Sequence, residues 1–438
     1  MRKHLVIFLL LVQSLWALDR QPTADYRARR QALAAKPDGG AVLLFASAES
    51  EGPNAVYGYR PEDNFYYLSG WPEPGAALLI VPATEKQPYT EILFLPNRNP
   101  VQEKWTGPKL GPENSEAAKI TGFDHVEGLD NLRAELVRLL PAQLAAIFTD
   151  VPGDEQNSNS EAALNWLRRS HAFPLSTSFK DVRPQLAALR TRKDWGEIEL
   201  IRKATEASVA AHLAAMHMMK PGITEREVAA VLQYEWGKRG CERPAYSPIV
   251  GSGFNSTVLH YSQDSQPIQG GDVVVIDAAG EYSMYASDIT RTLPASGKFT
   301  ARQREIYDIV LGAQQAAIAA FKPGKSRLRR KQPDSLYDIA YSYINSHGKD
   351  LHGQPLGQYF IHGLGHYVGL NVHDQGDYDV ALGSGMVFTL EPGIYIPEER
   401  LGVRIEDVVY IDKDGKLVNL TAGLPHSAEE IEREMAGR

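Results

Sequence analysis

The sequence predicts an α+β protein with an N-terminal α/β domain and a larger C-terminal domain of two similar halves. A chain of 438 residues has room for two or three domains and a large core. Short apolar runs alternate with helical patterns from about residue 40 to 182, as in α/β domains. A helix, a Lys-Pro-Gly turn, a second helix and Gly-rich strands then occur twice, with turns at Lys220–Gly222 and Lys322–Gly324. The repeat predicts a pseudo-two-fold domain whose halves face each other across a cleft.

The first segment, residues 1–17, is expected to be a signal peptide rather than part of the fold. Arg2 and Lys3 precede the apolar run Leu5–Val12, and Ala17 offers a cleavage position. A membrane-spanning helix needs about 20 apolar residues, so this run is too short to remain a stable span. We therefore expect export to the periplasm or the medium. The alternative is an ordinary first helix or strand.

The N-terminal domain is expected to cover residues 18–185, and its elements follow in order. Apolar runs predict strands at Ala41–Phe45, Phe65–Leu68, Ala76–Pro82, Glu91–Leu95 and Ala145–Thr149. Helical patterns occupy Asn131–Leu140 and Glu161–Arg169. Few titratable groups cluster here, so we expect the chemistry elsewhere.

The C-terminal domain is expected to cover residues 190–438. A long amphipathic helix is predicted from Asp194 to Met219, and Thr224 with Glu227 forms a capping box for the next. In the second half, Thr300 with Gln303 opens a helix, and another follows around Leu336–Ile344. The basic segment 325–331 between them is predicted to be a solvated surface insertion, with partner binding as the alternative.

Composition excludes several classes of protein. Hydrophobic residues are 43% and charged residues 23%, close to a soluble globular average, which excludes collagen-like, disordered and polytopic membrane chains. The net charge of −8 and the absence of a long basic block argue against nucleic-acid binding. A single cysteine, Cys241, excludes intramolecular disulfides and zinc ribbons. We expect Cys241 to be a packed structural thiol, and a catalytic nucleophile is the alternative.

Carboxylates interrupt apolar strands in the C-terminal domain. Asp277 ends the run Val273–Ile276 and Asp288 precedes Ile289–Leu293, with a turn expected at Gly280–Ser283. If Asp277 and Asp288 pair across this hairpin, their Cβ atoms lie about 5 Å apart. Two buried like charges at that separation need a cation or a proton between them.

Further polar residues follow toward the C-terminus. The segment FIHGLGHYVGLNVHD supplies His362, His366 and His373, and Gly363 and Gly365 argue against a helix between the first two. Glu391 and Glu406 each interrupt a predicted strand, and Arg404 shares a strand face with Glu406. Four carboxylates with one imidazole suit Mn²⁺, Co²⁺ or Zn²⁺ in an oxygen-rich two-metal site.

The chain resembles the creatinase/aminopeptidase P branch of the methionine-aminopeptidase-like, pita-bread metallopeptidases. The stretches PEDNFYYLSGWPEPGAALLIVP and LRTRKDWGEIELIRKA carry this resemblance, as do five ligand positions in order. It implies a creatinase-type N-terminal domain, a pita-bread catalytic domain and two divalent metals, Mn²⁺ first. By position, the implied ligands are Asp277, Asp288, His366, Glu391 and Glu406. The implied cleft residues are His260, His362, His373 and Arg404.

The resemblance implies an Xaa-Pro aminopeptidase acting on peptides with proline second, in a dimer or tetramer. Metal-activated hydroxide would attack the carbonyl, His260 and His373 would stabilise the oxyanion, and Glu391 would shuttle the proton. A dipeptide-restricted prolidase is the alternative, because the HGLGH motif occurs in both. A peptide-binding relative without metals, or a metal-free creatine hydrolase, is less consistent with five retained ligand positions.

Overall fold

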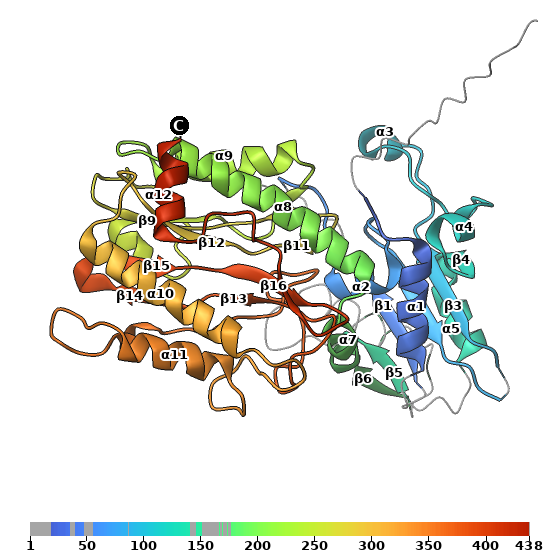
Figure 1. The fold of residues 1–438 in the computed structure, drawn as a ribbon. Coiled ribbons are helices and arrows are strands. Elements are labelled where there is room, and N and C mark those ends of the chain that lie inside the picture. The colour runs from blue at the N-terminus through green and yellow to red at the C-terminus, as the bar shows by residue number, and fades with distance from the viewer. Residues whose placement is uncertain are drawn as a thin grey trace, which may run out of the picture.

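The computed structural model describes residues 19–35, 40–47, 56–85, 87–140, 146–150, 166, 169, 173 and 177–437. The expected signal peptide and most of the helix expected at Glu161–Arg169 lie outside these residues. The described chain forms two domains side by side (Figure 1). Within the described part of the chain, no helix is long and apolar enough to cross a bilayer.

The N-terminal domain is built on a six-stranded mixed sheet of order β4-β3-β2-β1-β5-β6. The strands are β1 (Ala41–Phe45), β2 (Ala77–Val81), β3 (Thr90–Leu95), β4 (His125–Gly128), β5 (Ala146–Thr149) and β6 (Ser178–Asp181). The helices are α1 (Thr23–Ala34), α2 (Asp63–Ser69), α3 (Glu103–Thr106), α4 (Ala117–Thr121), η1 (Leu129–Asn131), α5 (Leu132–Leu139) and α7 (Arg183–Arg190). Strands β1, β2 and β3 pair antiparallel, and β4, β5 and β6 add in parallel. Four predicted strands and the first predicted helix are thus confirmed.

The strand predicted at Phe65–Leu68 is wrong, because this run lies in helix α2. All four of its residues are buried, and Gly70 closes the helix in the left-handed conformation. A short apolar run buried on every side has the same pattern in a helix as in a strand, so periodicity could not separate the two.

The C-terminal domain places short sheets between two helix pairs. The helices are α8 (Trp195–Met218), α9 (Glu225–Lys238), η2 (Gly253–Thr257), α10 (Ala301–Ala320), α11 (Leu336–Ser346), η3 (Leu356–Tyr359), η4 (Pro397–Glu399) and α12 (Ala428–Ala436). The strands are β7 (Arg243–Pro244), β8 (Ile249–Ser252), β9 (Val273–Asp277), β10 (Gly280–Tyr282), β11 (Tyr285–Ala286), β12 (Thr290–Pro294), β13 (Val387–Leu390), β14 (Gly393–Ile396), β15 (Leu401–Arg404), β16 (Asp407–Ile411) and β17 (Leu417–Asn419). Helices α8 and α9 pack together over β8, β10 and β11, and α10 packs on α11, β14 and β15 (Figure 1). The two-half architecture expected from the repeat is confirmed.

The predicted helix starts of this domain are also confirmed. Asp194, Thr224 and Thr300 each accept a hydrogen bond from the backbone N–H three residues on, and a capping box closes each start. Cys241 is buried, and burial raises the pKa of its thiol to about 12. The thiolate that a nucleophile requires is therefore disfavoured, as expected for a packed cysteine.

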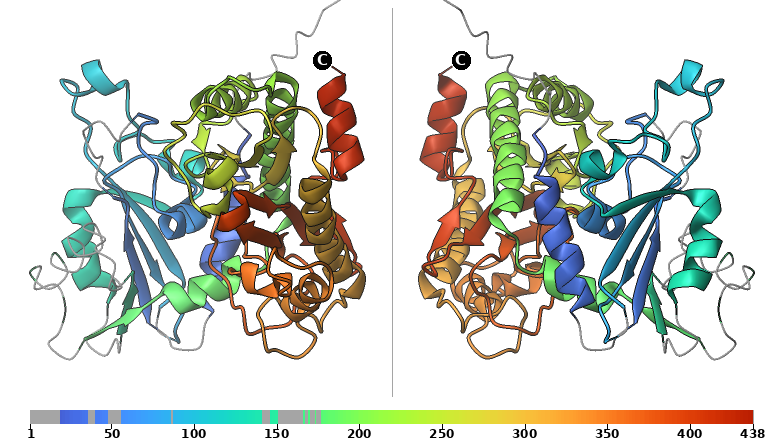
Figure 2. Two further views of the ribbon diagram at one scale, coloured as in Figure 1. Left: turned by 90° about the vertical axis from the view of Figure 1, so that its left-hand side faces the viewer. Right: turned by 90° about the vertical axis from the view of Figure 1, so that its right-hand side faces the viewer.

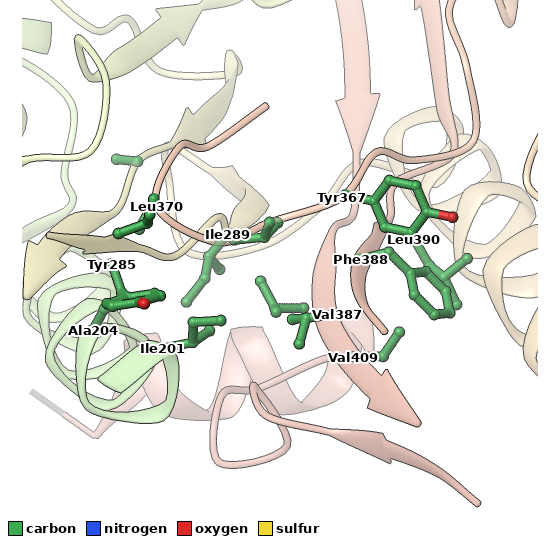
Figure 3. Packing of buried hydrophobic residues seen from close by; sticks show 14 of the residues in the cluster. Ile201, Ala204, Tyr285, Ile289, Tyr367, Leu370, Val387, Phe388, Leu390 and Val409 are labelled. Atoms are coloured by element: carbon green, nitrogen blue, oxygen red, sulfur yellow. The ribbon is translucent and has the colours of Figure 1, made fainter. Parts of the chain in front are cut away.

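The core of the C-terminal domain lies directly behind the strand ends that carry the predicted site. In Figure 3, Ile201 and Ala204 of α8 pack near Tyr285 and Ile289, while Phe388 and Leu390 of β13 lie near Tyr367. Ile289, Tyr367 and Leu390 are at most 1% exposed. Each is the neighbour in sequence of a predicted ligand, so packing of the core fixes where those ligands emerge.

Charged side chains join the two domains, and Arg29 and Arg190 among them are buried. Helix α1 lies between the six-stranded sheet and the C-terminal domain (Figure 2), and its Arg29 pairs with Asp194 at 2.6 Å. Arg190 of α7 donates to Asn64 in the N-terminal domain and to Asp374 in the C-terminal domain. Arg60 bonds Glu281 Oε2 at 2.8 Å and the carbonyl of Leu370 at 2.6 Å.

Candidate metal centre

All nine predicted site residues line one cavity of about 700 Å³ in the C-terminal domain. They are His260, Asp277, Asp288, His362, His366, His373, Glu391, Arg404 and Glu406. They come from four separated segments of the chain, which the two halves of the domain bring together. A volume of this size is typical of a small-molecule or peptide site.

The pairing expected between Asp277 and Asp288 differs from the observed register. Strand β9 pairs antiparallel with β12 so that Asp277 faces Thr290 rather than Asp288. Asp288 lies two residues before Thr290, after a second small hairpin formed by β10 and β11. The expected turn at Gly280–Ser283 is displaced, because Gly280–Tyr282 is strand and Ser283 and Met284 turn with positive φ.

Tyr246 joins the two aspartates. Its hydroxyl lies 2.6 Å from Asp277 Oδ1 and 2.5 Å from Asp288 Oδ1. A phenol has one proton and donates to one carboxylate at a time. The other short contact therefore joins two acceptors, which is stable only with additional positive charge or a proton nearby.

Glu406 also lies at a strand break rather than within one strand. Strand β15 ends at Arg404 and β16 begins at Asp407, so the expected continuous strand is two strands of different sheets. Thr290 donates its hydroxyl to Glu406 Oε2 at 2.8 Å and accepts from Arg404 Nε at 3.2 Å. Arg404 and Glu406 therefore meet on one side, as expected, through Thr290.

Three side chains already form a group with metal-ligand spacing. Ligand atoms of Asp288, His366 and Glu406 all lie within 4.8 Å of one another. His366 Nε2 lies 3.2 Å from Asp288 Oδ2 and 3.5 Å from Glu391 Oε1. Asp277 adjoins this group through Tyr246 and through its bond with Arg404 at 2.6 Å.

The geometry of His366 suits a metal ligand. Its Nδ1 lies 3.1 Å from the carbonyl of Tyr367, which can only accept, so Nδ1 carries the proton. The lone pair of neutral His366 is then on Nε2, which faces Asp288 and Glu391. Metal-binding histidines are usually oriented by such a second hydrogen bond to a carbonyl or carboxylate.

The charge of the cluster also favours cations. Four carboxylates face at most two positive protein groups, Arg404 and a protonated His366. Burial, and then the charges of Asp288 and neighbouring carboxylates, raise the pKa of Glu406 well above its ordinary value and that of Glu391 to about 7. Burial lowers the pKa of His366, but Asp288 and Glu391 outweigh it and raise the value to about 9. Protein groups alone leave the cluster short of positive charge, which divalent cations would supply.

A directed hydrogen-bond chain fixes His362. Its Nδ1 donates to the carbonyl of Gly363 at 2.8 Å, so its Nε2 accepts from the Tyr395 hydroxyl at 2.8 Å. That hydroxyl in turn accepts from Arg404 Nη1 at 2.8 Å. Burial and the charge of Arg404 lower the pKa of His362 to about 4. His362 is therefore held neutral in one tautomer.

His260 and His373 face the cavity from two loops. His260 follows η2 and is exposed, and the ring of His373 meets that of His366 edge to face with centroids 4.3 Å apart. Burial and the neighbouring His366 lower the pKa of His373. Both imidazoles are placed to donate hydrogen bonds to a molecule in the cavity.

Sequence reasoning missed Tyr246, Thr290 and Tyr395. Thr290 could have been found, because it lies two residues after Asp288 in an extended segment and so shares its face. Tyr246 and Tyr395 carry no such signal, since the chain has 20 tyrosines and only the fold brings these two to the cluster.

Comparisons with known proteins agree with this geometry. The pattern of metallopeptidase family M24 matches residues 199–413, and that of the aminopeptidase P N-terminal domain matches residues 26–148. A Haemophilus influenzae protein named Xaa-Pro aminopeptidase is 34% identical over 94% of this chain and 97% of its own. A Pyrococcus furiosus Xaa-Pro dipeptidase is 44% identical over 80% of this chain and 89% of its own. The solved structure of zinc-substituted Escherichia coli aminopeptidase P in complex with product has a TM-score of 0.84 at 32% identity, over 96% of this chain and 99% of that one.

Proposed function

The chain belongs to metallopeptidase family M24, and we propose that it acts as an Xaa-Pro aminopeptidase, releasing the N-terminal residue of peptides whose second residue is proline. The observation that carries this proposal is that four carboxylates and four imidazoles line one cavity, with His366 Nε2 3.2 Å from Asp288 Oδ2. The chain is a metallo-exopeptidase by family, and its match to the aminopeptidase P N-terminal domain supports the aminopeptidase, although some prolidases carry this domain too.

We propose that Asp277, Asp288, His366, Glu391 and Glu406 hold two divalent cations, with Mn²⁺ as the first candidate. The oxygen-rich donor set, the Nε2 lone pair of His366 and the surplus negative charge all fit such ions. When bound, the cations supply Lewis-acid activation of water and of the scissile carbonyl.

The protein's own residues orient the ligands and the substrate. Arg404 holds Asp277 and, through Thr290, Glu406, so that neither carboxylate can rotate freely. A carboxylate of the cluster can accept hydrogen bonds from the amino terminus of a peptide, which imposes exopeptidase register. His260 and His373 then donate hydrogen bonds to the oxygen on which negative charge develops.

Glu391 is placed to move the proton. Its Oε1 accepts from Thr389 at 3.3 Å, while its Oε2 faces His362 Nδ1 at 3.7 Å, beyond hydrogen-bond distance. Oε2 can therefore take a proton from the attacking water and pass it to the leaving nitrogen. A proline imide has no N–H to bind, so recognition must rest on these other groups.

A second candidate is an Xaa-Pro dipeptidase, favoured by the 44% identity to the Pyrococcus furiosus protein. Kinetics on Ala-Pro and Ala-Pro-Ala with added Mn²⁺ separate the two. We expect Ala-Pro-Ala to be the better substrate. If the enzyme cleaved Ala-Pro but not Ala-Pro-Ala, it would be a dipeptidase instead.

Metal analysis tests the site itself. We expect about two Mn²⁺, Co²⁺ or Zn²⁺ per chain at saturation, and loss of activity on chelation that Mn²⁺ restores best. Fewer than one ion per chain at saturation would favour a peptide-binding relative without catalysis.

We further propose that residues 1–17 direct export and that the mature chain forms a dimer or tetramer. The basic and apolar pattern of the first residues supports the first proposal, and the family resemblance supports the second. N-terminal sequencing of protein from cell fractions and sedimentation velocity test them separately.

A further inference from the structure

A second cavity of about 690 Å³ adjoins the metal-site cavity. The two share His362, Gly363, Gly365 and Tyr378 in their walls. The outer wall of the second cavity comes from residues 328–330, in the basic segment between α10 and α11. The segment that the sequence marked as a surface insertion therefore borders the cleft.

Two arginines make this second cavity positively charged. Arg329 lies over the ring of Tyr378, 4.8 Å from its centroid, at the junction of the cavities. Its one acidic neighbour among the described residues is Asp379, 3.8 Å away and largely exposed. Arg330 is exposed and makes no hydrogen bond or ion pair with the described part of the chain.

Aromatic rings form a rigid wall beneath these charges. Tyr337 of α11 stacks on Phe360 with centroids 5.0 Å apart, and Phe360 meets His362 edge to face at 5.3 Å. The stack runs from the outer cavity to the neutral histidine of the metal site. A peptide lying along it would contact apolar rings on one side and guanidinium groups at its far end.

We propose that Arg329 and Arg330 bind a carboxylate of the substrate beyond the proline, so that the enzyme favours acidic or short free-acid peptides. This rests on the proposed function. The carboxylate cluster holds the amino terminus, and an extended peptide advances about 3.3 Å per residue, so the residues after proline leave that cluster. Arginine matches a carboxylate with two parallel hydrogen bonds. The carboxylate is either the C-terminal group of a tri- or tetrapeptide or an acidic side chain near that position.

The test compares Ala-Pro-Ala and Ala-Pro-Ala-Ala, each as free acid and as amide, with Ala-Pro-Ala-Asp-amide. We expect kcat/KM to be higher for the free acids or the Asp peptide than for the plain amides, through KM. In Arg330→Gln this preference should fall about two- to fivefold, the size of one exposed ion pair. The plain amides, which carry no carboxylate beyond the proline, should be cleaved by Arg330→Gln at the wild-type rate. The preference should also weaken with added salt.

Lys325→Gln is the matched control, since Lys325 is an exposed cation of the same segment that lines neither cavity. This variant should keep the full preference for free acids or the Asp peptide over plain amides. The double variant Arg329→Gln with Arg330→Gln should lose more of that preference than Arg330→Gln does. A free-acid preference alone identifies the C-terminal carboxylate, and a preference for the Asp amide identifies a side chain. This inference would be overturned if the wild type cleaved carboxylate-bearing peptides and plain amides with equal kcat/KM, or if Lys325→Gln lost as much preference as Arg330→Gln. Either result would leave the proposed function standing. If no peptide is cleaved with Mn²⁺ present, the proposed function fails with it.

Discussion

At the scale of single residues, three neutral hydroxyl groups help to position the polar side chains of the site. Thr290 links Arg404 with Glu406, Tyr246 links Asp277 with Asp288, and Tyr395 links Arg404 with His362. Like charges are thereby held closer than they would lie in water. The arrangement stores repulsion that bound cations would relieve.

Glu406→Gln should abolish turnover while leaving the fold intact. The amide has one neutral oxygen where the carboxylate has two charged ones, so it cannot hold two cations. Its oxygen can still accept from Thr290, and the flanking Val403, Ile405 and Val408 stay packed. Activity at saturating Mn²⁺ and thermal melts with and without Mn²⁺ check this.

The thermal melts of Glu406→Gln test a second prediction, which concerns stability with and without Mn²⁺. With chelator present, Glu406→Gln should melt no lower than the wild type, because removing one of four carboxylates relieves repulsion. The rise in Tm on adding Mn²⁺ should shrink, since binding stabilises only the state that binds. Glu398→Gln, an exposed change that affects only a pair with His352, should behave as wild type. Near-native turnover in Glu406→Gln would show that the metal-site assignment is wrong.

At the scale of elements, helix starts and loops are tied to the site by buried groups that no motif marks. Glu225, the first residue of α9, is fully buried and accepts five hydrogen bonds from the loop that carries His260. Helix α8 contributes His212, whose Nε2 bonds the carbonyl next to Asp277.

Glu225→Gln should loosen the loop around His260. One side-chain oxygen becomes an NH₂ group, which must face the donors Tyr261 and Gln266 N–H or those of Ser252 and Asn255. We expect a loss of about 2–3 kcal/mol in the free energy of unfolding. We also expect at least tenfold lower kcat/KM, because a displaced catalytic group is costly. Urea unfolding and peptide kinetics measure both.

Glu227→Gln, two residues along the same helix, is the control. Glutamine serves in a capping box as glutamate does, so stability and activity should change little. If Glu225→Gln were as mild as this control, Glu225 would not be what holds the His260 loop.

His212 should make stability fall in acid. Burial lowers the pKa of His212 to about 4, whereas an unfolded histidine has a pKa of about 6.5. Between these values only the unfolded chain binds the proton, so the contribution of His212 is complete above pH 6.5 and is lost as the pH falls toward 4. Between pH 7 and pH 5 this amounts to about 2 kcal/mol.

His212→Gln removes that titration while keeping a donor near Ala278. From pH 7 to pH 5, the variant should therefore lose about 2 kcal/mol less unfolding free energy than the wild type, as measured in urea. His217→Gln, a half-exposed change on the same helix, should keep the wild-type dependence. Parallel pH profiles for all three proteins would contradict the assignment.

At the scale of the whole molecule, the domain interface holds a loop of the site. Asp374 follows His373 directly, and its carboxylate is 2% exposed between Arg190 and Lys193. Burial raises the pKa of Asp374, but Arg190 and Lys193 outweigh it and hold the value below the ordinary range. The N-terminal domain, which Arg190 also contacts through Asn64, therefore helps to place His373.

Asp374→Asn should destabilise the protein by about 3–5 kcal/mol, because buried Lys193 loses its carboxylate partner and buried Arg190 retains Asp63, at 3.3 Å, but loses Asp374. Activity should fall with it, through the displaced His373 loop. Calorimetry and peptide kinetics measure the two effects. Asp379→Asn, an exposed change five residues along, should cost at most about 1 kcal/mol. Equal melting temperatures for the two variants would mean that the interface does not depend on this carboxylate.

The sequence by itself determined the two-half domain, the helix starts and the five ligand candidates, because each leaves a local mark. Capping residues precede a helix directly, and a carboxylate in an apolar strand stands out. Only the tertiary structure decided that Asp277 faces Thr290, that Phe65–Leu68 is helical, and that Tyr246 joins two aspartates. It also brought Arg329 and Arg330 to the cleft. These features are the register of strands, burial on every side and contacts between distant segments. They depend on how the elements pack together, and no single stretch of the sequence carries a local signal for that packing.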